Sequence, residues 1–335
     1  MANFQDWSVG SGKETTYGTA VTVNRWYEFT EPKPFTPDRG IKQGVGIRPG
    51  ARVARSARRV QTLRQATGDI TVEMCSKGLG LLLEACMGTG TSTLVSGSTY
   101  QQNHTLADSL TSHTIQFGVP NVNGTIRAET YAGCVVSAWE FGGAVGDIAT
   151  LKTTWDARSW TTATAYATPS YPTANLNNLF TVEDAALYTG TYTAATSTAL
   201  ASATTALSGV KDFKLSVDNA IIADRFFAGA SGLKDKPLPG LRLPSVEMNV
   251  EYQDNTLWDA FEADTDLTLV VTLSAGALGV GNETIQIALP CLRLDGDLPE
   301  GGPDVVASQA IKLSVLDNLT NPPLFISTRT SDTAL

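Results

Sequence analysis

The chain has 335 residues, which is long enough for one large domain or for two ordinary domains with separate cores. Charged residues make up only 17% of it, 33 acidic against 24 basic, while Thr, Ala, Gly and Ser are plentiful. This balance is typical of β-rich proteins whose surfaces are largely covered by neighbours, so an assembly is plausible. No apolar stretch approaches the length of about 18 residues that a membrane-spanning helix needs.

The N-terminal segment, MANFQDWSVGSGKETTYGT, is polar and has no basic stretch followed by an apolar run. We therefore expect a soluble chain that is not exported. The four cysteines are scattered without a C-x-x-C pair, which argues against a zinc knuckle and against a disulfide framework. We predict reduced core residues at Cys75, Cys86, Cys134 and Cys291.

A strongly basic stretch, residues 39–64, is called the arm below. It holds eight Arg or Lys residues and no acidic residue, and removing those eight from 24 leaves 16 basic against 33 acidic residues, a net charge of −17. Complementary charge favours self-recognition, in which the arm of one subunit lies on the acidic flank of another. Two alternatives stay open. The arm could bind nucleic acid, although it lacks aromatic residues for base stacking, or it could simply be solvated.

The first half of the chain alternates apolar and polar residues, as half-buried strands do, around 70–74 and 115–119, and VNGT at 122–125 predicts a turn. Helical spacing interrupts this pattern once. Leu79, Leu82, Leu83 and Cys86 recur on one face behind a candidate cap, Ser76, and predict a short helix near 77–87.

The second half has the same order of patterns. Alternation over 246–252 is followed by a second helix near 255–263, with Asp254 or Asn255 as the candidate cap and Leu257, Trp258 and Phe261 as its core residues. Alternating stretches over 267–273, 285–289 and 311–315 complete the half as strands.

These parallel orders come with a sequence match. ITVEMCSKGLGLLLEA at 70–85 lies without a gap on MNVEYQDNTLWDAFEA at 248–263, with five identical pairs in sixteen. Weaker blocks match in the same order: 26–39 with 212–225, 134–143 with 291–302, and 150–158 with 310–318. We predict a mainly β protein with short helices, made of two tandem units that arose by duplication, each flanked by one helix.

The predicted boundaries are 1–158 for the first unit, 159–177 for a Thr/Ser/Ala-rich connection and 178–335 for the second unit. The region 159–209 is nearly free of charge, and a tolerant linker or surface decoration is favoured there over a separate binding module.

Signals of chemistry are poor. The only histidines, His104 and His113, fall in a Ser/Thr-rich stretch that we expect to be a loop, and no nucleophile, zinc-protease or nucleotide motif is present. The loop 295–304 carries four carboxylates but lacks calcium-loop spacing, so a solvated loop is favoured over a cation site. We expect that the protein is not an enzyme and that it has no catalytic residues, no cofactor and no metal.

The order of features resembles the major tail, or tail tube, proteins of long-tailed bacteriophages. The resemblance rests on GKETTYGTAVTVNRWYEF (12–29), TGDITVEMCSKGLGLLLEACMG (67–88), VKDFKLSVDNAIIADR (210–225), SVEMNVEYQDNTLWDAFEADTDLTLVVTL (245–273) and ETIQIALPCLRLDG (283–296). It implies units that are β-sandwiches or barrels flanked by a helix, stacked as rings into a hollow tube. The protein would belong to the virion after assembly in the host cytoplasm.

The resemblance also implies a role for the arm, since such proteins project a long loop onto adjacent subunits or rings. Five arginines occupy that loop here: Arg48, Arg52, Arg55, Arg58 and Arg59. The counterpart in the second unit, 226–243, is expected to be shorter and less basic.

Rings of the family contain six units, so two units per chain imply homotrimeric rings with pseudo-sixfold symmetry. A homohexamer is the alternative. The implied partners are further copies of the chain and other tail proteins, with DNA passing through the lumen without specific binding and no membrane contact. The competing function is a β-rich carbohydrate- or ligand-binding module that uses Trp139, Trp155, Trp160 or Trp258 as a platform.

Overall fold

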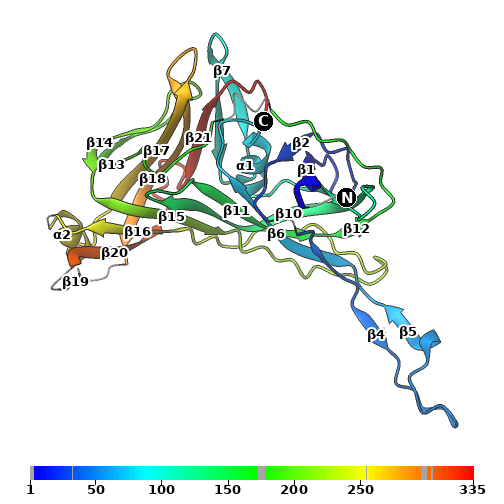
Figure 1. Ribbon diagram of the computed structural model, residues 1–335. Helices are drawn as coiled ribbons and strands as arrows, with labels where there is room; N and C mark the ends of the chain where they lie inside the picture. Colours follow the sequence, from blue (N-terminus) through cyan, green and yellow to red (C-terminus); the bar gives the residue numbers. More distant parts are fainter. Residues whose placement is uncertain (1–3, 32, 173–177, 254, 296–299, 303–304) are drawn as a thin grey trace.

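A computed structural model of the chain describes residues 4–31, 33–172, 178–253, 255–295, 300–302 and 305–335. The described residues form antiparallel strands with two short α-helices, which confirms the expected mainly β fold (Figure 1). One long sheet runs through the molecule, and further strands pack against its apolar face. The arm leaves the body as a thin hairpin at the lower right of the view.

The first half contributes strands to both layers. Its elements, besides the arm, are β1 (Ser8–Lys13), β2 (Arg25–Tyr27), β3 (Thr36–Asp38), β6 (Gln65–Glu73), α1 (Gly80–Met87), β7 (Thr91–Ser96), β8 (Thr99–Thr105), β9 (His113–Pro120), β10 (Ile126–Ala144), β11 (Thr150–Ala157) and β12 (Ser159–Thr161). The strands pair in the order β2-β1-β9-β10-β11-β6-β3, and the long strand β10 passes from one layer into the other.

The second half is arranged in the same way. Its elements are β13 (Ala185–Thr193), β14 (Ser202–Leu207), β15 (Val210–Asp218), β16 (Ser245–Glu251), α2 (Thr256–Glu262), β17 (Leu267–Ala277), β18 (Asn282–Leu294), β19 (Glu300–Gly302), β20 (Val305–Val315) and β21 (Phe325–Thr330). Its pairing order is β14-β13-β17-β18-β20-β16-β15.

Seven strands and one helix therefore follow each other with the same partners in both halves. In each half the helix follows the strand in which the matched sequence block begins. That strand is β6 in the first half and β16 in the second. The main difference between the halves is the hairpin β7–β8, which is inserted after α1 and pairs with β21 of the second half. The two halves therefore share one pairing order, and an origin by duplication stays a prediction from the sequence match.

The strand register assigns different equivalent residues from those of two of the weaker sequence alignments. Thr36 stands opposite Thr67 and Ser216 opposite Ser245, and the two partners differ by the same 178 positions as the matched block. Thr36 therefore corresponds to Ser216, six residues before the position that the alignment of 26–39 with 212–225 assigns. The last block is displaced by two residues in the same way.

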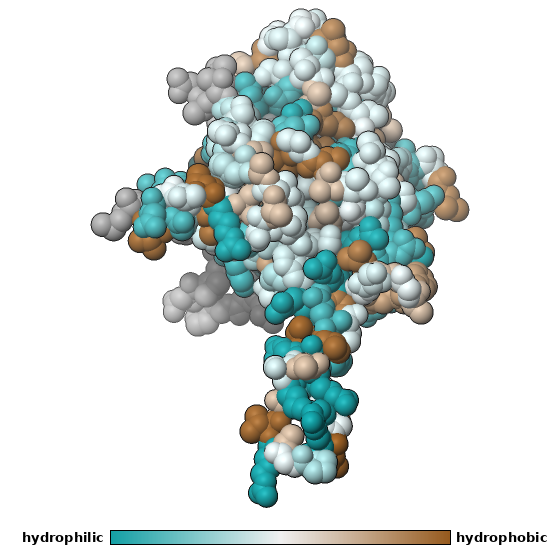
Figure 2. Space-filling model, turned by 90° about the vertical axis from the view of Figure 1, so that its right-hand side faces the viewer, coloured by the Kyte–Doolittle hydropathy of each residue, from teal (hydrophilic) through white to brown (hydrophobic). Residues whose placement is uncertain are grey.

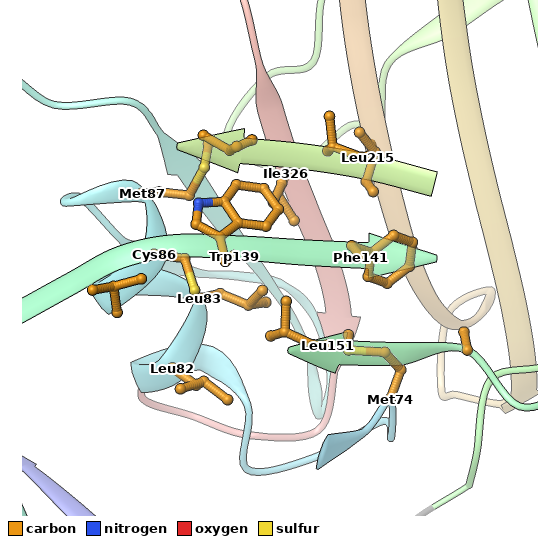
Figure 3. Close-up of a cluster of buried hydrophobic side chains, with 14 of the residues drawn as sticks. Met74, Leu82, Leu83, Cys86, Met87, Trp139, Phe141, Leu151, Leu215 and Ile326 are labelled. Carbon is orange, nitrogen blue, oxygen red and sulfur yellow. The ribbon is translucent and has the colours of Figure 1, made fainter. Parts of the chain in front are cut away.

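The halves share one hydrophobic core. Trp139 and Phe141 of β10 pack with Leu83 of α1 and, from the second half, with Leu215 of β15 and Ile326 of β21 (Figure 3). The halves are also joined by the pairs β10·β15 and β8·β21. Because apolar surface is buried across the boundary, each half contributes to the stability of the other.

The two helices differ in environment. All eight residues of α1 are buried, including Leu82 and Leu83 in the helix and Leu79 just before it. No residue of α2 is fully buried: Leu257 packs partly against the core, and the ring of Trp258 lies 5.4 Å from that of Phe261, which is 38% exposed. The residues of the first helix thus lie in the core, whereas Phe261 lies at the surface of the isolated chain.

The expected helix caps are corrected by the structure. Ser76 does not cap α1, because Leu79 occupies the cap position and the Ser76 hydroxyl instead accepts a hydrogen bond from the amide of Asn178, at 3.1 Å. Asn255 does occupy the cap position of α2, but its side chain accepts a hydrogen bond from the Tyr252 hydroxyl rather than from the helix. Asp254 lies outside the described residues.

Candidate assembly surfaces

The arm is an exposed antiparallel hairpin. Strands β4 (Ile41–Gln43) and β5 (Arg59–Gln61) form its stem, and a 3-10 turn, Ser56–Arg58, precedes β5. Figure 2 shows the arm as a narrow projection that carries both hydrophilic and hydrophobic residues. With so few contacts of its own, this segment gains little stability from the core of the chain that bears it.

The five arginines of the arm all lie on this projection. Arg48, Arg52, Arg58 and Arg59 are exposed, and Arg55 is partly buried by the arm itself, where it donates to the carbonyl of Gly46. No salt bridge to these five side chains is found among the described residues. Three aliphatic side chains, Val45, Ile47 and Val53, are more than four-fifths exposed beside them. Such a surface has both charge and apolar area to offer a partner.

The corresponding loop of the second half has a different path. This segment, 219–244 between β15 and β16, is called the return loop here, because it folds back onto the first half of its own chain. The amide of Arg64, at the base of the arm, donates to the carbonyl of Gly232, and Arg242 donates to the carbonyl of Ala107. Lys234, which is fully buried, forms an ion pair with Asp156 of β11. Burial raises the pKa of the Asp156 carboxyl, and the Lys234 ammonium opposes that rise.

The return loop is not much shorter than the arm, contrary to the sequence-based expectation. Thirty residues separate Thr36 from Thr67, and 28 separate their counterparts Ser216 and Ser245. The two loops differ mainly in their contacts, since one lies on its own chain and the other extends into solvent.

The second candidate surface is the outer face of the long sheet, called the polar face here. It consists of alternate residues on six neighbouring strands, in the order β6, β11, β10, β15, β16 and β20. The intervening residues, such as Leu151, Leu215 and Val246, are buried in the core. A groove of about 780 Å³ runs across the polar face, so the sheet is concave on this side.

The polar face is acidic on balance. Its charged residues are seven acids and four lysines: Asp69, Glu73, Glu140, Asp212, Asp218, Glu247, Glu251, Lys152, Lys211, Lys214 and Lys312. The net charge is therefore −3. Lys152 lies 3.5 Å from Asp69, and Lys214 lies 3.2 Å from Glu140. Its other side chains are small, so the face offers no aromatic platform and no arginine to a phosphate.

Comparison with known proteins identifies the family of the protein that carries these surfaces. The sequence matches the family described as phage tail tube protein over residues 5–315, which is nearly its whole length. The chain belongs to the phage tail tube protein family. No curated protein sequence matches it significantly. Tail tube proteins are structural components of the virion, and membership implies self-association and association with other tail proteins.

The remaining candidate residues of the tail tube protein lie in its interior. His104 and His113 are in β8 and β9 rather than in a loop, and both are fully buried. Burial lowers the pKa of His104 to about 4 and that of His113 to about 3. Each ring has a hydrogen-bond partner, since His104 lies 3.2 Å from the carbonyl of Thr89 and His113 lies 3.0 Å from the Thr111 hydroxyl. These are features of core histidines.

The burial of the four tryptophans does not fit their interpretation as a ligand platform. Trp139 and Trp155 are buried in the core and are inaccessible to a carbohydrate. Trp160 is partly buried, with the Arg64 guanidinium 6.0 Å from its ring centroid, and Trp258 is partly buried on α2.

Most of the acidic loop considered as a cation site, namely 296–299 and 303–304, lies outside the described residues. Among the residues that are described, no group of three or more His, Cys, Asp or Glu side chains is arranged to hold a metal ion. Cys86, Cys134 and Cys291 are buried free thiols and Cys75 is partly buried. No helix in the described part of the chain is long and apolar enough to cross a membrane.

Proposed function

We propose that copies of this tail tube protein form rings that stack into a hollow tube, and that phage DNA passes through the tube on ejection. The observation that carries the proposal is the polar face, a concave, one-sided sheet surface of net negative charge. Like charge on a channel wall keeps phosphates from adsorbing, whereas clustered arginine would bind them. The polar face is therefore assigned to the lumen.

Each chain is proposed to supply two equivalent units, so that three chains close a ring of pseudo-sixfold symmetry. The support is the shared pairing order of seven strands in the two halves. At the β10·β15 junction, moreover, the two halves already lie side by side in one continuous sheet, as neighbouring units of a ring wall would. A ring of six chains is the competing arrangement.

Electron microscopy of the purified protein at high concentration tests both parts of the proposal. Rings or tubes are expected, and end-on views of a ring should show three arms. Six arms per ring would support the hexamer. A protein that stays monomeric under all conditions, without rings or tubes, would contradict tube assembly and favour the binding-module alternative.

A further inference from the structure

The arm and the return loop are the same connection in the two halves, with one of them docked and the other free. Each joins register-equivalent strands, β3 to β6 or β15 to β16, and the stretches between register-equivalent residues, Thr36 to Thr67 and Ser216 to Ser245, differ by two residues. The return loop binds the first half, which lies on the other side of the β10·β15 junction. Within one chain the arm has no second half in the equivalent place. Its equivalent docking surface therefore has to come from another chain.

The docking site of the return loop can be mapped onto the second half by strand register. Lys234 binds Asp156, which is six residues after Thr150 of β11, and Thr150 stands opposite Glu73. In the second half the counterpart of Glu73 is Glu251, and Ser308 stands opposite it. Six residues after Ser308 is Ser314, so Ser314 of β20 occupies the position that corresponds to Asp156.

The position of Ser314 lies beside a concentration of exposed carboxylates. The Ser314 hydroxyl donates a hydrogen bond to the carboxylate of Asp295. Asp264 and Asp266 lie within 2.8 Å and 3.0 Å of the Arg293 guanidinium on the neighbouring strand β18, and Asp317 follows β20. We call these four aspartates, Asp264, Asp266, Asp295 and Asp317, the acidic corner. Arg293 balances only one of the four charges.

The acidic corner and the arm lie at opposite edges of the long sheet. The arm leaves the sheet at β3 and β6, whereas the corner lies at β18 and β20, and Figure 1 shows these two regions far apart. One chain therefore cannot satisfy its own arm. Two different surfaces at opposite edges fit a head-to-tail contact, which closes into a ring when the rotation is right.

We propose that the arm of one chain binds the acidic corner of the next chain, in the way that the return loop binds the first half of its own chain. This inference rests on the proposed function and adds the identity of the acceptor. Two independent observations carry it. The register places the acceptor at Ser314, and the charge there is opposite to that of the arm. The edge strand β3 contains Pro37, which has no amide to donate, so side-chain contacts of the arm suit this junction better than a continued strand ladder.

A designed cysteine cross-link tests this contact in assembled protein. Lys234 lies eleven residues before Ser245, and Ser56 lies eleven residues before Thr67, so Ser56 is the arm position that corresponds to Lys234. A variant with Ser56→Cys and Ser314→Cys should form tubes that give a ladder of covalent oligomers with a short bis-maleimide cross-linker, because the two Cβ atoms of a lysine–aspartate contact lie farther apart than a disulfide spans. Each single variant, and the control pair Ser56→Cys with Ser96→Cys on the exposed end of β7, should not.

The outcomes separate this inference from the proposed function. Tubes without the ladder would overturn the acceptor assignment and leave the tube function intact. Failure of the wild-type protein to form rings or tubes would remove both. If only the cysteine variant fails to assemble, charge exchange replaces it: Arg58→Glu with Arg59→Glu should block assembly, and adding Asp295→Lys with Asp317→Lys to the same chain should restore it. No restoration would contradict the inference.

Discussion

The Lys234 ammonium and the Asp156 carboxylate form an ion pair from which water is excluded, since Lys234 is fully buried and the Asp156 side chain is 7% exposed. Lys234 comes from the return loop of the second half and Asp156 from β11 of the first half. Among the residues that the structure describes, the other oxygen of the Asp156 carboxylate has no hydrogen-bond partner. Lys234 is therefore the cation that neutralises the buried Asp156 carboxylate, alongside the hydrogen bonds of Gly232 and Arg242 that also hold the return loop on the first half.

Removing that charge should be costly. Lys234→Met keeps most of the side-chain volume but leaves Asp156 buried without a cation, and breaking a buried pair in this way costs about 3–5 kcal/mol of unfolding free energy. The control is Lys152→Met, which breaks the exposed pair with Asp69 and should cost less than about 1 kcal/mol. Urea unfolding of the monomeric protein measures both. Equal costs for the two variants would mean that the buried pair has no special role.

Local sequence patterns predicted the strands with clear alternation and both helices, because alternation and helical spacing report which side of an element is buried. Strands β16, β17 and β20 and helix α1 were found in this way. The same patterns do not report what covers a face. The hairpin β7–β8 was missed because its Thr, Ser and Gln residues give little apolar contrast, although Gln101 and His104 are fully buried in it.

The candidate surfaces could be predicted only in part, because the sequence shows the charges but not which strands are neighbours. The arm is visible in the sequence because eight like charges without a counterion cannot be buried in one chain. The polar face and the acidic corner depend on the strand order, which brings together residues as distant as Asp69 and Lys312 on one sheet. Lys234 looks like an ordinary surface lysine in the sequence, and only the path of the return loop shows that it is buried.

The buried histidines should make the fold sensitive to acid. Their pKa values in the folded state, about 4 for His104 and about 3 for His113, lie below the value of about 6.5 expected in the unfolded chain. The unfolded chain then binds protons that the folded chain does not. Stability is fully present above about pH 6.5 and is lost as the pH falls, by about 2 kcal/mol for each histidine between pH 6.5 and 5.

Urea midpoints at pH 7 and pH 5 measure this loss. The variant His104→Gln with His113→Gln removes both titrating groups, so its midpoint should change less between the two pH values than that of the wild type. An equal change in both proteins would show that other groups control the acid response.

The two helices should respond differently to truncation. Leu83→Ala in α1 removes a fully buried side chain and should cost about 2–5 kcal/mol of unfolding free energy. Phe261→Ala in α2 removes a side chain that is 38% exposed and should cost less than about 1 kcal/mol in the monomer. Urea unfolding of the unassembled protein compares them. A large loss from Phe261→Ala would mean that α2 supports its unit as strongly as α1 does.

Charge reversal on the polar face should change how tubes treat DNA. Replacing Glu73, Glu140 and Glu247 by Lys turns seven acids and four lysines into four acids and seven lysines, so the net charge of the face changes from −3 to +3. Tubes of this variant should retain DNA in a salt-dependent way, because lysines in the lumen bind phosphates with release of counterions. Wild-type tubes should retain little DNA, as a filter-binding assay will show.

The matched control for the lumen reverses three exposed acids that are not on the polar face: Glu28, Asp108 and Glu183. Control tubes should release DNA as the wild type does. If control and lumen variants retain DNA equally, total charge rather than the polar face decides, and the lumen assignment is wrong.

Charge reversal in the arm should separate folding from assembly. Arg58→Glu with Arg59→Glu should leave the monomer folded, because both side chains are exposed and contribute nothing to the core. It should abolish tube formation, since truncating one partner of a desolvated charge pair costs about 2–5 kcal/mol at every interface of a ring. Circular dichroism and electron microscopy on one sample distinguish the two effects.

The variant Arg58→Lys with Arg59→Lys keeps the charge of the arm and serves as the matched control, and it should still build tubes. Wild-type tubes should loosen as salt is raised, because exposed charges are screened beyond about 10 Å at 0.1 M salt. The opposite result has a clear meaning. If the Glu variant builds normal tubes but loses affinity for DNA in a filter-binding assay, the arm contacts nucleic acid, and its assignment to the neighbouring subunit is wrong.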